Sequence, residues 1–177
     1  KWSAIRGDAL NLPFKDASFD KIVCSEVLEH LKDDGRGVRE MVRVLKDNGI
    51  LAVSVPTYLT ETIYWKISKD YCNSPGGHVR KYRARELINL LRQNNLCIYA
   101  IRHKHGLHSI YWLLRCLFGL KKEKAPIPFL YYKFLVWDMK TNYKLFRLVE
   151  GVLNGLFPKS VVIYTCKGGL PKRQGQK

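Results

Sequence analysis

Residues 50–55 form a nearly continuous apolar run, Ile-Leu-Ala-Val-Ser-Val, and Pro56 follows it directly. This composition is typical of a parallel strand covered on both faces, because a half-exposed strand alternates apolar and polar residues. Proline donates no hydrogen bond to a sheet, so Pro56 marks the end of the strand. Shorter apolar runs at 3–6 and 21–25 predict two further parallel strands. The first third of the chain is therefore predicted to build an α/β sheet.

A helical pattern separates the second and third predicted strands. Apolar residues between 38 and 45 recur at positions i, i+3, i+4 and i+7, which is the spacing of one helix face. Asp33 and Asp34 are available to cap the start of this helix, and Gly49 follows its end. A strand, a helix and a strand joined by short connections form a βαβ unit.

The second half of the chain carries a different pattern. Residues 84–93 read as an amphipathic helix, and the runs at 96–102 and 160–166 read as strands that pair with each other. The long segment 103–158 between them is rich in aromatic residues and lysines. Because a connection of that length rarely lacks secondary structure, we predict that it is mostly helical.

Charge divides the chain in the same place. Of the net charge of +16, residues 1–102 contribute +5 (17 Lys/Arg against 12 Asp/Glu) and residues 103–177 contribute +11 (14 against 3). We therefore predict a core at 1–102, a helical insertion or lid at 103–158, and a final strand with a flexible tail at 159–177. The basic insertion is suited to an anionic membrane surface or to nucleic acid.

The five cysteines are scattered, without a C-x-x-C pair. This pattern argues against a disulfide scaffold or a zinc knuckle, and it favours a reducing, cytoplasmic location. No apolar stretch approaches the roughly 20 residues needed to span a bilayer. Any membrane association is therefore predicted to be peripheral.

Polar residues follow each predicted strand of the core. Gly7-Asp8-Ala9 comes after the first, Ser25-Glu26 after the second, and Thr57 after Pro56. Ligands of open parallel sheets bind outside the carboxyl ends of the strands. The sequence therefore predicts a ligand site at this edge.

These motifs, taken in order, carry a family resemblance. Gly7-Asp8-Ala9 with Leu12-Pro13-Phe14, Ser18-Phe19-Asp20, residues 28–31 (Leu-Glu-His-Leu) and residues 45–49 (Leu-Lys-Asp-Asn-Gly) resemble the class I S-adenosylmethionine-dependent methyltransferases of the type 11, small-molecule group. The resemblance covers about residues 1–102 and the final strand. It implies a Rossmann-like parallel sheet that ends in an antiparallel strand pair.

The resemblance also implies cofactor contacts. Asp8 would accept a hydrogen bond from the adenine amine of S-adenosylmethionine, with Ala9 and Leu10 beside the ring. Ser25 and Glu26 would lie beside the methionine moiety and the transferable methyl group. Read without the family, Asp8 is a turn residue and Glu26 an acid that favours the start of a helix.

Two histidines are candidate bases. His78 lies in Gly76-Gly77-His78, where similar methyltransferases often place a histidine toward the acceptor, and His30 is the second candidate. Arg80 and Tyr82 are the candidate acceptor-binding residues. The histidines at 103, 105 and 108 have no cysteine or carboxylate nearby in sequence, so no metal site is predicted there.

One family motif is missing from this sequence. No G-x-G-x-G or G-x-G-x-x-G occurs, although the family's cofactor loop is glycine-rich. We therefore expect the chain to be the C-terminal part of a methyltransferase and to bind cofactor poorly by itself. The alternative predictions are a non-catalytic remnant that binds membranes or RNA, and an RNA methyltransferase. Family members that methylate base amino groups carry Pro-Pro-aromatic where this chain has Ser25-Glu26-Val27, which favours a small-molecule or lipid-like acceptor.

Overall fold

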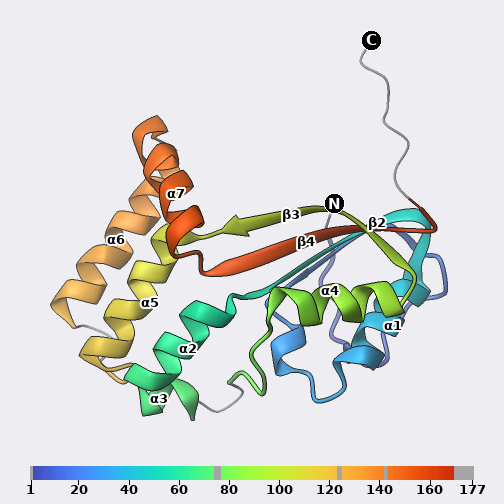
Figure 1. The fold of residues 1–177 in the computed structure, drawn as a ribbon, viewed down its shortest axis with the longest axis horizontal. Helices are drawn as coiled ribbons and strands as arrows, with labels where there is room; N and C mark the ends of the chain where they lie inside the picture. Colours follow the sequence, from blue (N-terminus) through green and yellow to red (C-terminus); the bar gives the residue numbers. More distant parts are fainter. Residues whose placement is uncertain (1, 74–76, 123–124, 142, 170–177) are drawn as a thin grey trace.

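The computed structural model describes residues 2–73, 77–122, 125–141 and 143–169. Its centre is a four-stranded mixed sheet in the order β1-β2-β4-β3 (Figure 1). The strands are β1 Phe19–Ser25, β2 Leu45–Pro56, β3 Leu96–Lys104 and β4 Ser160–Lys167. β1 and β2 run parallel, whereas β4 runs antiparallel to both β2 and β3. The predicted strands at 21–25, 50–55, 96–102 and 160–166 are all present.

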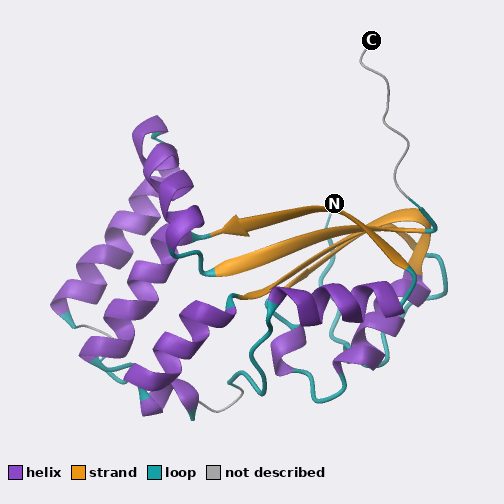
Figure 2. Ribbon diagram, in the orientation of Figure 1, coloured by secondary structure: helices purple, strands orange, loops and turns teal. Residues whose placement is uncertain are grey.

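The helices form two groups. One short 3₁₀ helix and seven α-helices are described: η1 Leu28–His30, α1 Asp34–Val44, α2 Tyr58–Ile67, α3 Lys69–Cys72, α4 Ala84–Gln93, α5 Gly106–Phe118, α6 Pro126–Thr141 and α7 Lys144–Leu156. Figure 2 shows α1 and α4 against one face of the sheet, with α5, α6 and α7 gathered beyond one end of it. The segment 103–158 is therefore largely helical.

Local sequence explains the two helices that cover the sheet. The Asp33 carboxylate accepts a hydrogen bond from the Arg36 amide at 2.8 Å and caps α1. At α4, the Glu86 side chain accepts a hydrogen bond from the Arg83 amide at 2.9 Å. The helices bury aliphatic side chains against the strands in one core cluster, which includes Val38, Met41, Leu87, Leu91, Leu51, Val53 and Ile163.

The predicted strand at 3–6 is wrong. Residues 2–7 have no regular secondary structure, and their side chains are exposed. A strand needs a partner for its backbone hydrogen bonds. Among the described residues, β1 pairs with β2 alone, and nothing forms a ladder with residues 2–7.

The sequence did not reveal α2. This helix buries Thr60, Glu61 and Tyr64 rather than a stripe of aliphatic side chains. A search for apolar periodicity therefore passes over it. Gly76, which precedes His78 in the candidate acceptor loop, and the tail from 170 lie outside the described residues.

Candidate functional site

A cavity of about 870 Å³ lies at the carboxyl ends of β1 and β2, between the sheet and the helices α3, α5 and α6. Its walls hold a set of aromatic side chains: Tyr71, Tyr111, Trp112, Phe129 and Tyr132. Polar residues at its strand end include Glu26, His78 and Lys159. The cavity thus combines an apolar wall with a few ionisable groups, as small-molecule sites do.

Glu26 is held at the end of β1 in a left-handed backbone conformation, with φ 53°. Its amide donates to the Ser54 carbonyl at 3.0 Å, and its carboxylate accepts from the Ser54 hydroxyl at 3.0 Å. The Ser25 hydroxyl lies 3.2 Å from the same Ser54 hydroxyl. Left-handed backbone is unfavourable for a residue other than glycine, so these contacts with β2 hold Glu26 in place. The side chains of both predicted residues, Ser25 and Glu26, thus contact Ser54 of β2.

Glu61 of α2 is the most connected carboxylate of the site, although it is only 1% exposed. It accepts hydrogen bonds from the Trp65 ring at 3.1 Å, the Tyr71 hydroxyl at 2.8 Å and the Lys159 ammonium at 3.4 Å. Burial by itself raises the pKa of Glu61, but the hydrogen bonds and positive charges of His78 and Lys159 outweigh it, so the pKa lies below its ordinary value. Glu61 is therefore an anion at neutral pH.

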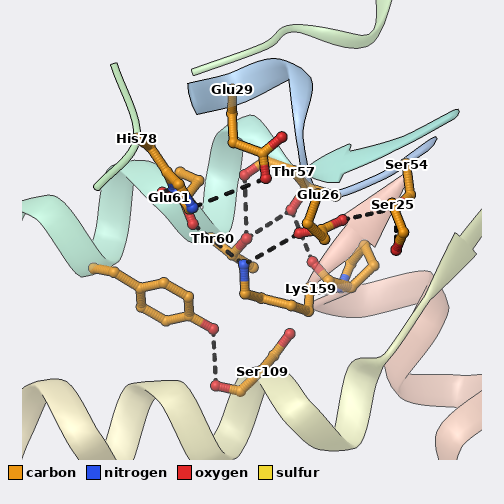
Figure 3. Close-up of polar contacts among 12 residues, drawn as sticks. Ser25, Glu26, Glu29, Ser54, Thr57, Thr60, Glu61, His78, Ser109 and Lys159 are labelled. Carbon is orange, nitrogen blue, oxygen red and sulfur yellow. Dashed lines mark hydrogen bonds and ion pairs between the residues drawn. The ribbon is translucent and has the colours of Figure 1, made fainter. Parts of the chain in front are cut away.

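His78 lies between two buried carboxylates (Figure 3). Its Nδ1 atom is 2.7 Å from Glu61, and its Nε2 atom is 3.9 Å from Glu29. The ring of His30 meets the ring of His78 edge to face, with 4.9 Å between their centroids. The Nδ1 atom of His30 is 3.3 Å from the Gly77 carbonyl. The two predicted histidines, 48 positions apart, are therefore neighbours in space.

Glu29 of η1 is 1% exposed, and neither carboxylate oxygen has a hydrogen-bond partner in the described part of the chain. Burial raises its pKa to about 7. A buried carboxyl group without partners is costly. Glu29 is thus the least satisfied polar group of the cluster.

Lys159 comes just before β4 and carries the only described ammonium against these carboxylates. Its Nζ atom lies 3.4 Å from Glu61 and 3.9 Å from Glu26, and the residue is 8% exposed. The Thr57 amide donates to the Lys159 carbonyl at 2.9 Å, which joins the end of β2 to the start of β4. Sequence reasoning missed both Glu61 and Lys159, because the first sits on an unpredicted helix and the second stands at the edge of the insertion.

Asp8, Ala9 and Leu10 lie away from this cluster. Asp8 is exposed, and its carboxylate accepts the Leu10 amide at 2.9 Å in a local turn. Ala9 lines a second, apolar cavity of about 330 Å³ beside β1 and α1, which shares no lining residue with the first. Two consecutive residues line different cavities: Glu26 lines the large one and Val27 lines the small one.

Arg80 and Tyr82 contact Asp34 at the start of α1. The Arg80 guanidinium donates to the Asp34 carboxylate and to the Lys32 carbonyl at 2.6 Å, and the Tyr82 hydroxyl donates to the same carboxylate. Neither residue lines the described cavity. The structure thus places Arg80 and Tyr82 at the connection between η1 and α1.

The architecture occurs in solved methyltransferases. An S-adenosylmethionine-dependent methyltransferase of Thermotoga maritima, described as a possible histamine N-methyltransferase, aligns with a TM-score of 0.58 at 20% identity, over 92% of this chain and 63% of its own. A methyltransferase of Archaeoglobus fulgidus aligns with a TM-score of 0.53 at 14% identity, over 94% of this chain and 68% of its own. The fold is the Rossmann-like fold of methyltransferases.

Sequence comparison finds related methyltransferases over the first half of the chain. Residues 2–53 match the type 11 family described as "Methyltransferase domain". A "Probable S-adenosylmethionine-dependent methyltransferase" of Mycobacterium tuberculosis is 39% identical over 87 residues, which are 49% of this chain and 30% of that protein. A demethylmenaquinone methyltransferase of Mycolicibacterium vanbaalenii is 36% identical over 67 residues, 38% of this chain and 29% of that protein. Residues 2–53 thus resemble a methyltransferase domain in sequence as well as in fold, and the matches span less than a third of these two relatives.

Proposed function

We propose that this chain transfers the methyl group of S-adenosylmethionine to a small, apolar acceptor. The observation that carries the proposal is that Glu26 and His78 line the aromatic cavity at the carboxyl ends of the strands. This is the edge at which open α/β sheets bind ligands. The family match over residues 2–53 covers β1 and most of β2, which build that edge.

The cofactor is proposed to lie across the end of β1. Its adenine would occupy the apolar cavity beside Ala9, with Leu10 next to the ring and the Asp8 carboxylate accepting from the exocyclic amine. Its methionine part would pass Ser25 and Glu26. Because Glu26 and Val27 line different cavities, this path leads the methyl group toward the larger one.

The acceptor is proposed to be quinone-like or lipid-like. Five aromatic side chains line a volume suited to a ligand of drug size. Two relatives are named for small acceptors: a demethylmenaquinone methyltransferase, and norajmaline N-methyltransferase of Rauvolfia serpentina, which is 53% identical over 38 residues, 22% of this chain and 13% of that protein. Both names favour a small molecule over nucleic acid.

Transfer would proceed in line, with the C–S bond breaking as the bond to the acceptor forms. Alignment in the cavity supplies most of the rate enhancement. An acceptor hydroxyl must also lose its proton, and His78 is the first candidate to assist that loss, with His30 the second. Arg80 and Tyr82 would act by holding η1 through Asp34, which keeps His30 in position.

The test uses S-adenosylmethionine with a labelled methyl group at millimolar concentration, incubated with a quinone and lipid extract or with total RNA. Label is expected in the organic phase, and His78→Ala should lower it at least about tenfold while leaving S-adenosylmethionine binding unchanged. His103→Ala, an exposed histidine of β3, is the matched control. Label in RNA alone, or no label in either fraction, would overturn the proposal.

A second proposal concerns the outer helices. α7 contains no buried side chain, and all its residues are described; Leu145, Leu148, Val152 and Leu156 recur along it at helical spacing and are all more than half exposed. Lys133 and Lys140 lie on α6 and Lys144 begins α7, in the part of the chain that carries a net charge of +11. We propose that this face lies on an anionic membrane, from which a lipid-like acceptor reaches the cavity. None of the described helices has the length and apolar content to cross a bilayer.

A further inference from the structure

We propose that Glu29, His30 and His78 bind one divalent transition-metal ion at the strand end of the large cavity. One ligand atom from each residue can be chosen so that all three lie within 4.8 Å of one another. The inference rests on the proposed function only for the role of the ion, because ion binding itself needs no cofactor or acceptor.

The first support is the hydrogen bonding of the two imidazoles. His78 places Nδ1 2.7 Å from the Glu61 carboxylate, and His30 places Nδ1 3.3 Å from the Gly77 carbonyl. Both partners are acceptors, so each Nδ1 atom donates a proton to its partner and Nε2 is the atom that an ion would use. Metal-binding histidines are oriented in this way by a carboxylate or a carbonyl.

The second support is the state of Glu29. Its carboxylate is 1% exposed and makes no hydrogen bond among the described residues, yet it lies 3.9 Å from the Nε2 atom of His78. A bound cation would compensate the cost of burying this group. The Glu29 carboxylate and the Nε2 atom of His78 therefore face the same position.

The third support is the charge of the cluster. Three carboxyl groups, those of Glu26, Glu29 and Glu61, belong to this cluster, and Lys159 supplies the one described ammonium beside them. The ammonium lies against Glu26 and Glu61, and it leaves Glu29 without a contact. One divalent ion beside Glu29 would give this carboxyl group the positive partner that Lys159 does not supply.

A second group with metal-ligand geometry is less suitable. His105, His108 and Glu150 also place ligand atoms within 4.8 Å of one another. However, the Glu150 carboxylate is bound to the Arg147 guanidinium at 2.8 Å. The Arg147 guanidinium already pairs with this carboxylate and would repel a metal cation, so we assign no ion there.

The donor set selects the kind of ion. Two imidazoles and one carboxylate suit zinc and neighbouring first-row metals better than magnesium or calcium, which prefer oxygen ligands. Ligand bonds of about 2.1 Å require the three atoms to draw together by roughly 1 Å, and His30 is exposed and free to adjust. The remaining coordination positions would face the cavity. An acceptor hydroxyl bound there loses its proton to water more readily, which is the assistance assigned above to the histidines.

The test is a titration of the chelator-treated chain with cobalt(II) and zinc(II), without cofactor or acceptor. We expect one ion per chain, visible absorption bands of histidine-bound cobalt, and displacement of cobalt by zinc. Glu29→Gln and His78→Ala should each weaken binding at least about tenfold, and Glu61→Gln, a positioning change, about 10–100-fold. His103→Ala is the matched control, and circular dichroism checks that every variant is folded.

Three results would overturn the inference: no saturable binding, binding that survives both Glu29→Gln and His78→Ala, or binding lost in His105→Ala. Failure of the proposed function gives a different pattern. A chain that binds the ion as described but transfers no methyl group contradicts methyl transfer alone. A chain that transfers methyl groups after complete metal removal contradicts the role of the ion in transfer, and not its binding.

Discussion

The Nδ1 atom of His78 lies 2.7 Å from the Glu61 carboxylate, and this contact joins the loop before α4 to the helix that follows β2. Seventeen positions separate the two residues, and Glu61 also reaches Lys159, 98 positions away, at 3.4 Å. Glu61 therefore connects α2 to two residues that line the cavity, His78 and Lys159. Its loss should loosen the site as a whole.

Glu61→Gln is expected to lower the free energy of unfolding by about 3 kcal/mol, because it leaves the buried Lys159 ammonium without its closest anion. Urea denaturation at pH 7 measures the change. Glu86→Gln is the control, since a glutamine at that position of α4 keeps the capping contact to Arg83. A loss as small as that of the control would show that the Glu61–Lys159 pair does not hold the site together.

The Glu40–Arg43 pair should make stability pH-dependent. Arg43 donates to Glu40 and to the carbonyls of Leu12 and Phe14, so the pair fixes the loop before β1. Hydrogen bonds from Arg43, first among several causes, lower the pKa of Glu40 to about 2 from an ordinary value of 4.5. A carboxyl with a depressed folded-state pKa stabilises the fold above the unfolded pKa of 4.5, and this stabilisation disappears as the pH falls toward 2.

We therefore expect Glu40→Gln to cost about 1 kcal/mol at pH 7, a modest value because solvent screens this partly exposed pair. The difference from the unmodified chain should shrink below pH 4.5. Thermal unfolding across the acidic range measures it, with Asp47→Asn, an exposed carboxylate of β2, as the control. A difference that is constant with pH would contradict the assignment.

Vesicle binding tests the exposed face of α7. The chain should co-sediment with vesicles that contain anionic lipid, and high salt should release it because salt screens the attraction. Replacing Leu148 and Leu156 together by serine should reduce binding several-fold without changing the midpoint of unfolding, since both side chains are exposed. Val23→Ser, which removes an exposed aliphatic residue from β1, is the control. Equal binding by the double variant and the control would exclude this face.

Cofactor affinity is expected to be low for the chain alone. The sequence contains no glycine-rich loop whose amides would approach the ribose, so we expect only the proposed contacts to the adenine and the methionine part. Calorimetry should give a dissociation constant well above the micromolar range. Tight, micromolar binding would mean that the contacts at Asp8 and Glu26 are sufficient without that loop.

The sequence was informative where aliphatic side chains repeat. The runs at 21–25 and 50–55 and the helices at 38–45 and 84–93 were predicted, because each buries a regular apolar face. α2 was missed because its buried face is polar. The predicted strand at 3–6 was wrong because apolar composition does not show whether a neighbouring strand is available for pairing.

The site shows the same limit. Ser25, Glu26, His30 and His78 were recognised from position and motif. Their arrangement around Glu29, Glu61 and Lys159 depends on contacts between distant segments, which no local pattern records. The pairing of Thr57 with Lys159, which brings the ammonium to the strand ends, is one such contact.

The most direct test of the account maps S-adenosylmethionine on the chain by backbone amide NMR, at millimolar concentrations where weak binding is visible. We predict saturable shifts at residues 8–10 and 25–27, on both sides of the end of β1, and their reduction in Glu26→Gln. Absence of saturable shifts at these positions, or shifts confined to α6 and α7, would contradict the proposal that this edge of the sheet holds the methyl donor.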